Sequence, residues 1–396
     1  MPLEAKILSM KQRRLLSGAL TWIAALGAAA CSSSHDSRRD AAVDVVYTAV
    51  DHNADTMYPE AGPPGPLGTP LPAGGEGQWT WVDFPDTRCR DGSSTGLAIN
   101  PSTASPNVMV FLDQGGACFN ADTCAFNLSA FGADSFVPQV QGIFNRDDPD
   151  NPVRTWSFVF IPYCSGDVHA GNRSDGFVDG GGGQQFLGYS NLDAFLSRIV
   201  PTFAGARQVL FAGSSAGGFG VLLNSDHVAR WFAPIPVTVL SDSGPPMPNS
   251  VAAPCLEQTW HDLWGFDRGA MLDCGLDCPS ASDYMIDFVL HFGWRYPSYR
   301  GGLISSAQDA TISVFLGFGE NGCAGGTLAP ADYQAGLLAF RGQVQVQGTP
   351  FGTYYIPSTQ HIWLMSDSGF ATSVNGVALK QWLADLLGGT VSHVGP

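Results

Sequence analysis

The pattern Gly-x-Ser-x-Gly occurs twice in the chain, centred on Ser94 and on Ser215. This pattern presents a nucleophilic serine when a buried strand precedes it and a helix follows, because the tight turn between them holds the hydroxyl above a sheet. The apolar run 208–212 and the helix-like segment 217–232 flank Ser215. Ser94 stands instead in a turn between two strand-like runs. We therefore predict that only Ser215 is a nucleophile.

A serine that attacks a carbonyl needs N–H groups that stabilise the negative charge developing on the carbonyl oxygen. One N–H belongs to the residue after the serine, and others come from an earlier loop that follows a strand. The apolar run 108–112 ends in such a loop, Asp-Gln-Gly-Gly-Ala-Cys at 113–118. Paired glycines let backbone N–H groups approach a ligand closely. We therefore predict oxyanion donors at Gly116, Ala117 and Ala216.

The base that activates such a serine is a histidine that follows it in the chain. His361 comes after the strand-like run 353–356 and a short polar loop, which places it at the end of a strand. A purely structural histidine is the alternative for this position. The other histidines after Ser215 lie in helix-like segments or in the C-terminal tail; they are His227, His261, His291 and His393.

The acid that orients His361 is harder to choose, because carboxylates are plentiful. Asp309 stands between a strand-like run and a helix-like segment, where a carboxylate fixes the tautomer of an imidazole. The same position suits a residue that only caps the helix. Glu320 and Asp242 are the other candidates, and Asp242 ends the strand that follows the helix of the serine turn.

Short apolar runs alternate with helix-like segments through the chain. This alternation predicts an α/β fold with a mainly parallel sheet and helices on both of its faces. Catalytic residues in such folds gather at the carboxyl ends of the strands. We expect strands at 108–112, 157–161, 208–212, 237–240, 303–305 and 353–356, and helices at 192–200, 217–232, 284–292, 311–316, 331–340 and 377–387.

Four blocks of the sequence together resemble the pectin acetylesterase/Notum family, in that family's order. They are FLDQGGAC at 111–118, IPYCSGDVH at 161–169, GSSAGG at 213–218, and Asp309 followed by His361. The resemblance implies an α/β-hydrolase fold and hydrolysis of carboxylic esters, with a triad of Ser215, His361 and Asp309, and it ranks Asp309 above Glu320. Where members commonly carry a tryptophan this chain has Ala117, so that wall of the pocket differs.

The reaction implied passes through a covalent acyl-enzyme at Ser215 and needs no cofactor. Members of the family act on acetylated pectin in plants and on a lipid-modified protein in animals. We therefore expect an acylated extracellular substrate, such as an acetylated polysaccharide. A lipase or peptidase of the same fold and a catalytically inactive binding module are the alternatives.

The 396-residue chain carries 19 Lys and Arg against 35 Asp and Glu, a net charge of −16. An acidic surface repels phosphate backbones, so we expect no nucleic-acid partner. We also expect no metal site. The acidic run 147–151 lacks a full calcium-loop pattern, and Cys274 and Cys278 are poorly spaced for zinc.

Residues 1–31 resemble a bacterial lipoprotein signal, in which a basic stretch precedes an apolar run too short to span a membrane. We expect lipid on Cys31, with an ordinary cleaved signal or an uncleaved anchor as alternatives. Each places the protein outside the cytoplasm, anchored to a bacterial membrane or secreted. The composition of residues 32–77, which are rich in proline and small side chains, indicates a linker. We expect residues 78–396 to form a single domain.

Eight of the nine cysteines remain once Cys31 carries lipid. An even number in an oxidising compartment predicts four disulfides that stabilise the domain. Only part of the pairing is foreseeable from spacing. We expect Cys118 to pair with Cys124, and the last four cysteines to pair among themselves.

Overall fold

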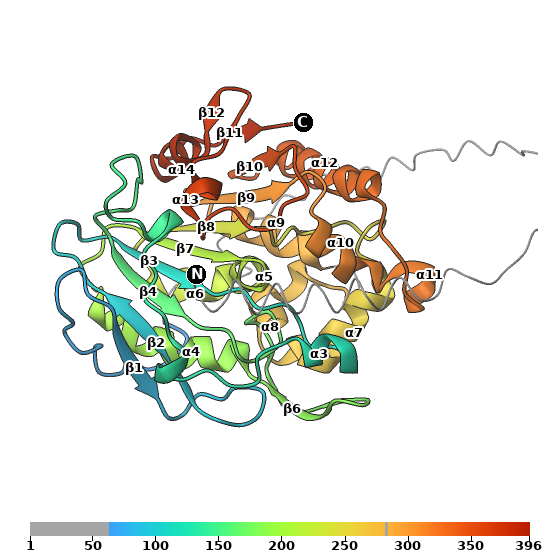
Figure 1. Cartoon of the computed structure of the whole chain (residues 1–396), viewed down its shortest axis with the longest axis horizontal. Coiled ribbons are helices and arrows are strands. Elements are labelled where there is room, and N and C mark those ends of the chain that lie inside the picture. Colours follow the sequence, from blue (N-terminus) through green and yellow to red (C-terminus); the bar gives the residue numbers. More distant parts are fainter. Residues whose placement is uncertain (1–62, 282–283) are drawn as a thin grey trace, which may run out of the picture. The chain divides into compact units, whose positions relative to one another are not determined.

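The computed structural model describes residues 63–281 and 284–396, which belong to one compact unit (Figure 1). Its main strands are β1 Thr80–Phe84, β2 Thr95–Asn100, β3 Val108–Leu112, β4 Ser157–Ile161, β7 Val209–Ser214, β8 Val237–Asp242, β9 Arg300–Ser306, β10 Phe351–Ile356 and β13 His393–Val394. Together they form a nine-stranded sheet in the order β1-β2-β4-β3-β7-β8-β9-β10-β13 within these residues. Every neighbouring pair from β4 to β13 is parallel. Only the pairs β1–β2 and β2–β4 are antiparallel, so the predicted mainly parallel sheet is confirmed.

The helices are α3 Ala121–Ala125, α4 Gly188–Thr202, α5 Ala216–Leu223, α6 Ser225–Phe232, α7 Pro254–Trp264, α8 Ala270–Cys274, α9 Met285–Arg295, α10 Ala310–Gly317, α11 Glu320–Cys323, α12 Pro330–Val346, α13 Asp367–Phe370 and α14 Leu379–Leu387. They cover both faces of the sheet. In β3, Val108 and Val110 pack in one core cluster with residues of α4, α5 and α9, whereas Met109 and Phe111 pack in a second cluster with residues of α14. Successive residues of a strand point to opposite faces, so the two clusters lie on opposite sides of the sheet.

All six predicted strands are present, but the predicted helix 217–232 is wrong as a single element. It is two helices, α5 and α6, which meet at Asn224. The side chain of this fully buried residue donates from Nδ2 to the carbonyl oxygens of Gly220 and His169. Asparagine competes with the helix for backbone partners, which explains the break.

Four disulfides join the described cysteines, as the sequence predicts. They are Cys89–Cys164, Cys118–Cys124, Cys255–Cys323 and Cys274–Cys278. The short pair and the grouping of the last four cysteines agree with the expectation. The disulfides are consistent with an extracytoplasmic protein.

The predicted leader with Cys31 and most of the predicted linker lie outside the described residues. Residues 63–77 form no helix or strand and run along α4, where the N–H of Gly68 donates to Ser197 O and the guanidinium of Arg198 donates to Thr69 O. Leu71 is buried within this otherwise largely exposed segment. The domain boundaries stay a prediction. In the described part of the chain, no helix is both long enough and apolar enough to cross a membrane.

Candidate active site

Ser215 occupies the turn between β7 and α5 with φ 56° and ψ −117°, a backbone conformation that residues other than glycine rarely adopt. The flanking glycines make the turn possible. A Cβ on Gly213 would lie 2.4 Å from Gly217 O, and a Cβ on Gly217 would lie 2.1 Å from Leu112 O. The N–H of Ser215 donates to Asp242 O at 2.7 Å, which ties the turn to β8. Ser94, in contrast, is exposed in the connection between β1 and β2.

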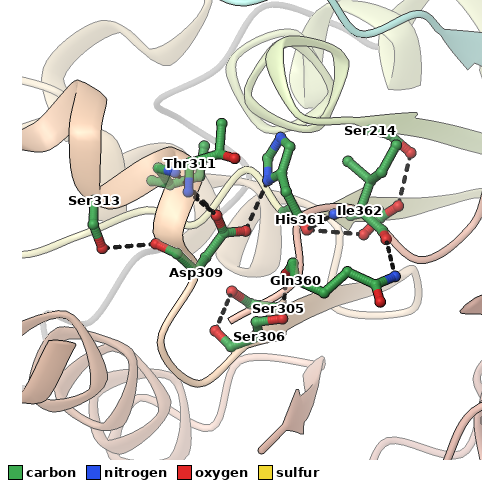
Figure 2. A network of polar contacts seen from close by, with 12 residues as sticks. Ser214, Ser305, Ser306, Asp309, Thr311, Ser313, Gln360, His361 and Ile362 are labelled. Carbon is green, nitrogen blue, oxygen red and sulfur yellow. Dashed lines mark hydrogen bonds and ion pairs between the residues drawn. The ribbon is translucent and has the colours of Figure 1, made fainter. Parts of the chain in front are cut away.

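His361 lies beyond the end of β10 and is paired with Asp309, which precedes α10 (Figure 2). The distance from His361 Nδ1 to Asp309 Oδ2 is 2.8 Å. A carboxylate only accepts, so the imidazole proton is on Nδ1 and the lone pair is on Nε2. Within the described residues, this buried Nε2 has no hydrogen-bond partner. The ring is therefore in the tautomer that a general base requires.

Asp309 performs two tasks at once. Its Oδ1 accepts from the N–H groups of Thr311 and Ile312 at 2.9 and 3.0 Å, which caps α10, while its Oδ2 faces His361. Figure 2 shows the carboxylate between the first turn of the helix and the imidazole. The helix-cap position and the imidazole-orienting position that we weighed as alternatives are thus the same place. Its side chain is fully buried, so the geometry is rigid.

The two other candidate acids have different surroundings. Among the described residues, neither Asp242 nor Glu320 hydrogen-bonds to His361. The fully buried Asp242 carboxylate accepts from Ser214 Oγ and from the N–H groups of Trp363 and Leu364 at 2.7 to 2.9 Å. Burial raises the pKa of Asp242, and these donors oppose that shift. Asp242 therefore holds the loop just after His361.

The loop after β3 lies against the serine turn. Gly116 has φ 82°, and a Cβ on Gly115 would lie 2.3 Å from the ring of Tyr163. Gly116, Ala117, Ser215 and Ala216 line one common pocket. Within the described residues, no protein acceptor takes the N–H of Gly116 or Ala117. Ala216 is the first residue of α5, where a helix leaves its own N–H free.

Within the described residues, no charged side chain lines the pocket beside Ser215. Aromatic and aliphatic groups from α5, α7, α9 and α10 form its walls. The small side chain of Ala117 leaves room where a larger residue would close the space. Beyond the four residues already named, the lining consists of Val168, Phe219, Leu223, Trp260, Trp264, Phe266, Tyr284, Met285, Ile312, Phe315 and Leu316.

The segment after β4 supports this arrangement, although its individual residues had no assigned role in the sequence analysis. Asp167 is fully buried, and its carboxylate accepts from Ser165 Oγ and from the N–H groups of His169 and Gly188. Burial raises the pKa of Asp167 to about 6. Burial also lowers the pKa of His169 to about 4, so its ring is neutral at pH 7. His169 Nε2 donates to Asp113 O at 2.8 Å, at the start of the oxyanion loop.

Among the described residues, no histidine lines the pocket itself, His361 included, so the remaining histidines after Ser215 are distinguished from His361 by their partners. Two of them are buried beside carboxylates, His227 beside Asp193 and Asp273, and His291 beside Asp277. Among the described residues, no group of three or more His, Cys, Asp or Glu side chains is placed to hold a metal ion. In the acidic run that we considered for calcium, Asp148 is paired with Lys380.

Comparisons with known proteins show what the chain is similar to. Residues 78–267 match the family model described as pectinacetylesterase. The chain is 35% identical over 153 residues to palmitoleoyl-protein carboxylesterase notum2 of Xenopus laevis, and 34% identical over 170 residues to the human NOTUM protein. Over this part of its length the chain is similar to proteins of the pectin acetylesterase/Notum family.

The crystal structure of the Wnt deacylase Notum from Drosophila shares the fold. It superposes with a TM-score of 0.58 and 20% sequence identity, over 78% of this chain and 94% of that chain. The α/β-hydrolase-like fold is therefore confirmed.

The sequence matches within the family are partial. They cover 36% and 39% of this chain and 30% and 34% of the Xenopus and human relatives, respectively, about a third of each relative's length. The family model spans Ser215 and the oxyanion loop but ends before Asp309 and His361. The assignment of those two residues therefore rests on their geometry in this chain.

Proposed function

We propose that this protein hydrolyses carboxylic esters, with Ser215 as nucleophile, His361 as general base and Asp309 as the carboxylate that orients it. The observation that carries the proposal is the strained serine turn, which shares a pocket with Gly116, Ala117 and Ala216. The free Nε2 of His361 supports it, because a base must have a lone pair available. The similarity to a family of esterases points the same way.

In the proposed reaction, His361 Nε2 takes the proton of the Ser215 hydroxyl as Oγ attacks the ester carbonyl. The carbonyl electron pair moves to oxygen, and the N–H groups at 116, 117 and 216 stabilise that charge. Collapse of the tetrahedral intermediate returns the proton to the leaving alcohol and leaves Ser215 acylated. Water, deprotonated by the same imidazole, then releases the acid. The residues named supply every proton transfer without a cofactor.

The pocket indicates which esters suit the site. An uncharged, largely apolar space desolvates a hydrocarbon chain, and each buried CH₂ contributes about 0.8 kcal/mol of binding. Trp260 and Trp264 are buried in the pocket wall and are therefore not exposed for stacking on a sugar. We therefore favour deacylation of an ester with a longer apolar acyl group over removal of acetate from a polysaccharide.

The test uses p-nitrophenyl esters from acetate to palmitate, with wild type, Ser215→Ala and Ser94→Ala. We expect kcat/KM to rise with chain length until the pocket is filled, and to fall by several powers of ten in Ser215→Ala without a change in melting temperature. Ser94→Ala is the matched control, because it removes the same hydroxyl from the other Gly-x-Ser-x-Gly copy, and it should stay within about twofold of wild type.

Two results would contradict the proposal. Absence of turnover and of labelling by a fluorophosphonate probe in the wild type would favour the catalytically inactive binding module. Equal losses in both serine variants would remove Ser215 as the nucleophile. A preference for acetyl esters over all longer ones would leave the mechanism intact but reject the apolar acyl group.

We also propose that the mature protein acts outside the cytoplasm, attached to a bacterial membrane through lipid on Cys31. The support is the leader-like residues 1–31 together with the four disulfides. Mass spectrometry of the mature N-terminus distinguishes the cases. A lipid-modified cysteine at 31 is expected, whereas an unmodified new N-terminus would show a secreted form.

A further inference from the structure

Asn127 is a buried residue just after α3, outside every motif that the sequence analysis identified. Its Nδ2 donates to the carbonyl oxygen of Gly115 at 2.8 Å. It also lies 3.3 Å from the position that a Cβ on Gly116 would take, so the amide packs directly against the oxyanion loop. A side chain that reaches this loop from elsewhere in the chain can control how the loop is oriented.

The peptide bond between Gly115 and Gly116 links the contact of Asn127 to the direction of the Gly116 N–H. A peptide group is planar and trans, so its C=O and N–H point in opposite directions. When Asn127 holds the carbonyl of Gly115 on one side, the N–H of Gly116 must point to the other. That N–H has no protein acceptor within the described residues, and Gly116 lines the pocket with Ser215.

Glycine makes the restraint necessary. Gly115 and Gly116 are adjacent residues without side chains, and glycine backbones rotate more freely than any other. Without a restraint, the peptide between them has an accessible flipped orientation that presents C=O to the pocket. A carbonyl oxygen there would repel the charge that develops on the substrate oxygen.

We propose that Asn127 is a positioning residue that holds the Gly115–Gly116 peptide with its N–H directed at the oxyanion. This inference rests on the proposed ester hydrolysis. Asn127 does not contact the reacting atoms and acts only through Gly116.

Asn127 is itself held firmly. The guanidinium of Arg90 donates from Nη2 to the carbonyl oxygens of Asn127 and Cys124, and from Nη1 to Gln184 Oε1. Arg90 follows Cys89, and its own N–H donates to the carbonyl oxygen of Cys164, the disulfide partner of Cys89. The backbone of Asn127 is thus anchored through Arg90 to a cross-linked part of the fold, whereas Oδ1 of its side chain has no hydrogen-bond partner among the described residues.

A second side chain restrains the same loop from its other end, where His169 Nε2 bonds to Asp113 O at 2.8 Å. The carbonyls of Asp113 and Gly115 are therefore both held by buried side chains. Of the two contacts, only that of Asn127 fixes the peptide whose N–H belongs to Gly116.

The experiment compares Asn127→Asp and Asn127→Ala with the control Asn120→Ala. The aspartate variant keeps the size of the side chain but loses the donor to Gly115. Asn120 caps the same short helix, α3, by accepting from Thr123 N at 2.9 Å, and it does not touch Gly115. Loss of this cap should therefore lower the melting temperature without changing the oxyanion loop.

Three quantities are measured for each variant: kcat/KM on the preferred ester, the inhibition constant of an alkyl trifluoromethyl ketone, and the dissociation constant of the straight-chain alcohol of equal length. The ketone adds to Ser215 and forms an oxyanion, whereas the alcohol only fills the apolar pocket. We expect both Asn127 variants to lose about 10²-fold in kcat/KM. We expect a parallel loss in ketone affinity, unchanged alcohol affinity, and near-wild-type values of all three in Asn120→Ala.

Other outcomes overturn the inference. Wild-type kcat/KM in folded Asn127→Asp would do so, as would a loss of kcat/KM without a matching loss of ketone affinity, because a general structural defect gives that result. If Asn127→Ala does not fold, Asn127→Asp decides alone. A wild type that neither turns over esters nor reacts with a fluorophosphonate probe rejects the proposed function itself, and the role of Asn127 with it.

Discussion

At the scale of single residues, the site depends on Asp309 having two oxygens with separate partners. One oxygen accepts from the first turn of α10 and the other faces His361. A carboxylate serves both, because each of its oxygens accepts. An asparagine in its place has only one acceptor oxygen and must present its NH₂ group either to the helix or to the imidazole.

This asymmetry predicts the behaviour of Asp309→Asn. The two N–H groups of the helix will keep the oxygen, since asparagine caps helices as well as aspartate does. The NH₂ group then faces Nδ1 of His361 and favours the tautomer in which Nε2 carries the proton. We expect turnover to fall by about 10³- to 10⁴-fold, with a melting temperature within a few degrees of wild type.

Kinetics and thermal melting of Asp309→Asn and Glu320→Gln provide the measurement. The double variant Asp309→Asn with Ser215→Ala should be scarcely less active than Ser215→Ala alone, because residues that act as a unit are not additive. Near-native turnover in Asp309→Asn, or a large kinetic defect in Glu320→Gln, would show that the acid is assigned wrongly while leaving Ser215 and His361 in place.

At the scale of elements, the loop after β10 carries His361 but has no regular structure of its own. Ile362 has φ 57°, and its N–H donates to Ser243 Oγ, while the next two N–H groups donate to Asp242. Both acceptor residues lie at the carboxyl end of β8. The base is therefore positioned by a neighbouring segment of the sheet edge as well as by Asp309.

For Asp242→Asn we expect a loss of both stability and activity. The three donors reach Oδ2, while Oδ1 accepts from Ser243 Oγ and the Trp363 N–H, so an amide sets its NH₂ group against a buried donor in either orientation. A buried donor left without an acceptor costs about 1–3 kcal/mol. Unfolding in urea should show a loss of that order, and turnover should fall because the loop no longer holds His361. Ser243→Ala, which removes a single acceptor from the same loop, is the milder comparison. If Asp242→Asn reduced turnover with unchanged stability, Asp242 would take part in catalysis and would not merely hold the loop after His361.

At the scale of the whole molecule, stability couples to pH through the buried pair Asp167 and His169. Burial lowers the pKa of His169 to about 4, against about 6.5 in an unfolded chain. Between those pH values only the unfolded state binds the proton, so falling pH destabilises the fold by up to about 1.4 kcal/mol per unit. Burial raises the pKa of Asp167 to about 6, so between pH 6 and about 4 only the folded state binds that proton. The two effects nearly cancel.

Replacing either Asp167 or His169 should make the effect of the other residue on the pH dependence of stability measurable. In His169→Gln, falling pH from 6.5 to 4.5 should raise the free energy of unfolding relative to wild type, because Asp167 is left unopposed. In Asp167→Asn, the same fall in pH should lower the free energy of unfolding relative to wild type, because His169 is left unopposed. Urea unfolding at several pH values measures both slopes. Curves parallel to wild type in both variants would mean that neither group titrates as its burial implies.

Much of the fold was predictable from local patterns, because a run of adjacent apolar residues is enough to mark a buried strand. The runs 108–112 and 157–161 are strands with those bounds in the structure. The serine turn was equally readable, since both glycines of its pattern, at 213 and 217, lie two residues from Ser215. Local patterns therefore suffice to predict an α/β sheet with a serine in a tight turn at the end of one strand.

Which distant groups meet depends on how the whole chain packs. β8 and β9 are parallel neighbours, so Asp242, which ends β8, and Asp309, which follows β9, lie at the same edge of the sheet. The sequence therefore offered both as the acid. The path of the loop after β10 brings the His361 ring to Asp309 and its following N–H groups to Asp242. Asn127 had no local signal, because its role arises only when the chain folds back onto Gly115. Contacts between residues far apart in the chain depend on how the sheet and its loops pack, and that packing is a property of the whole fold.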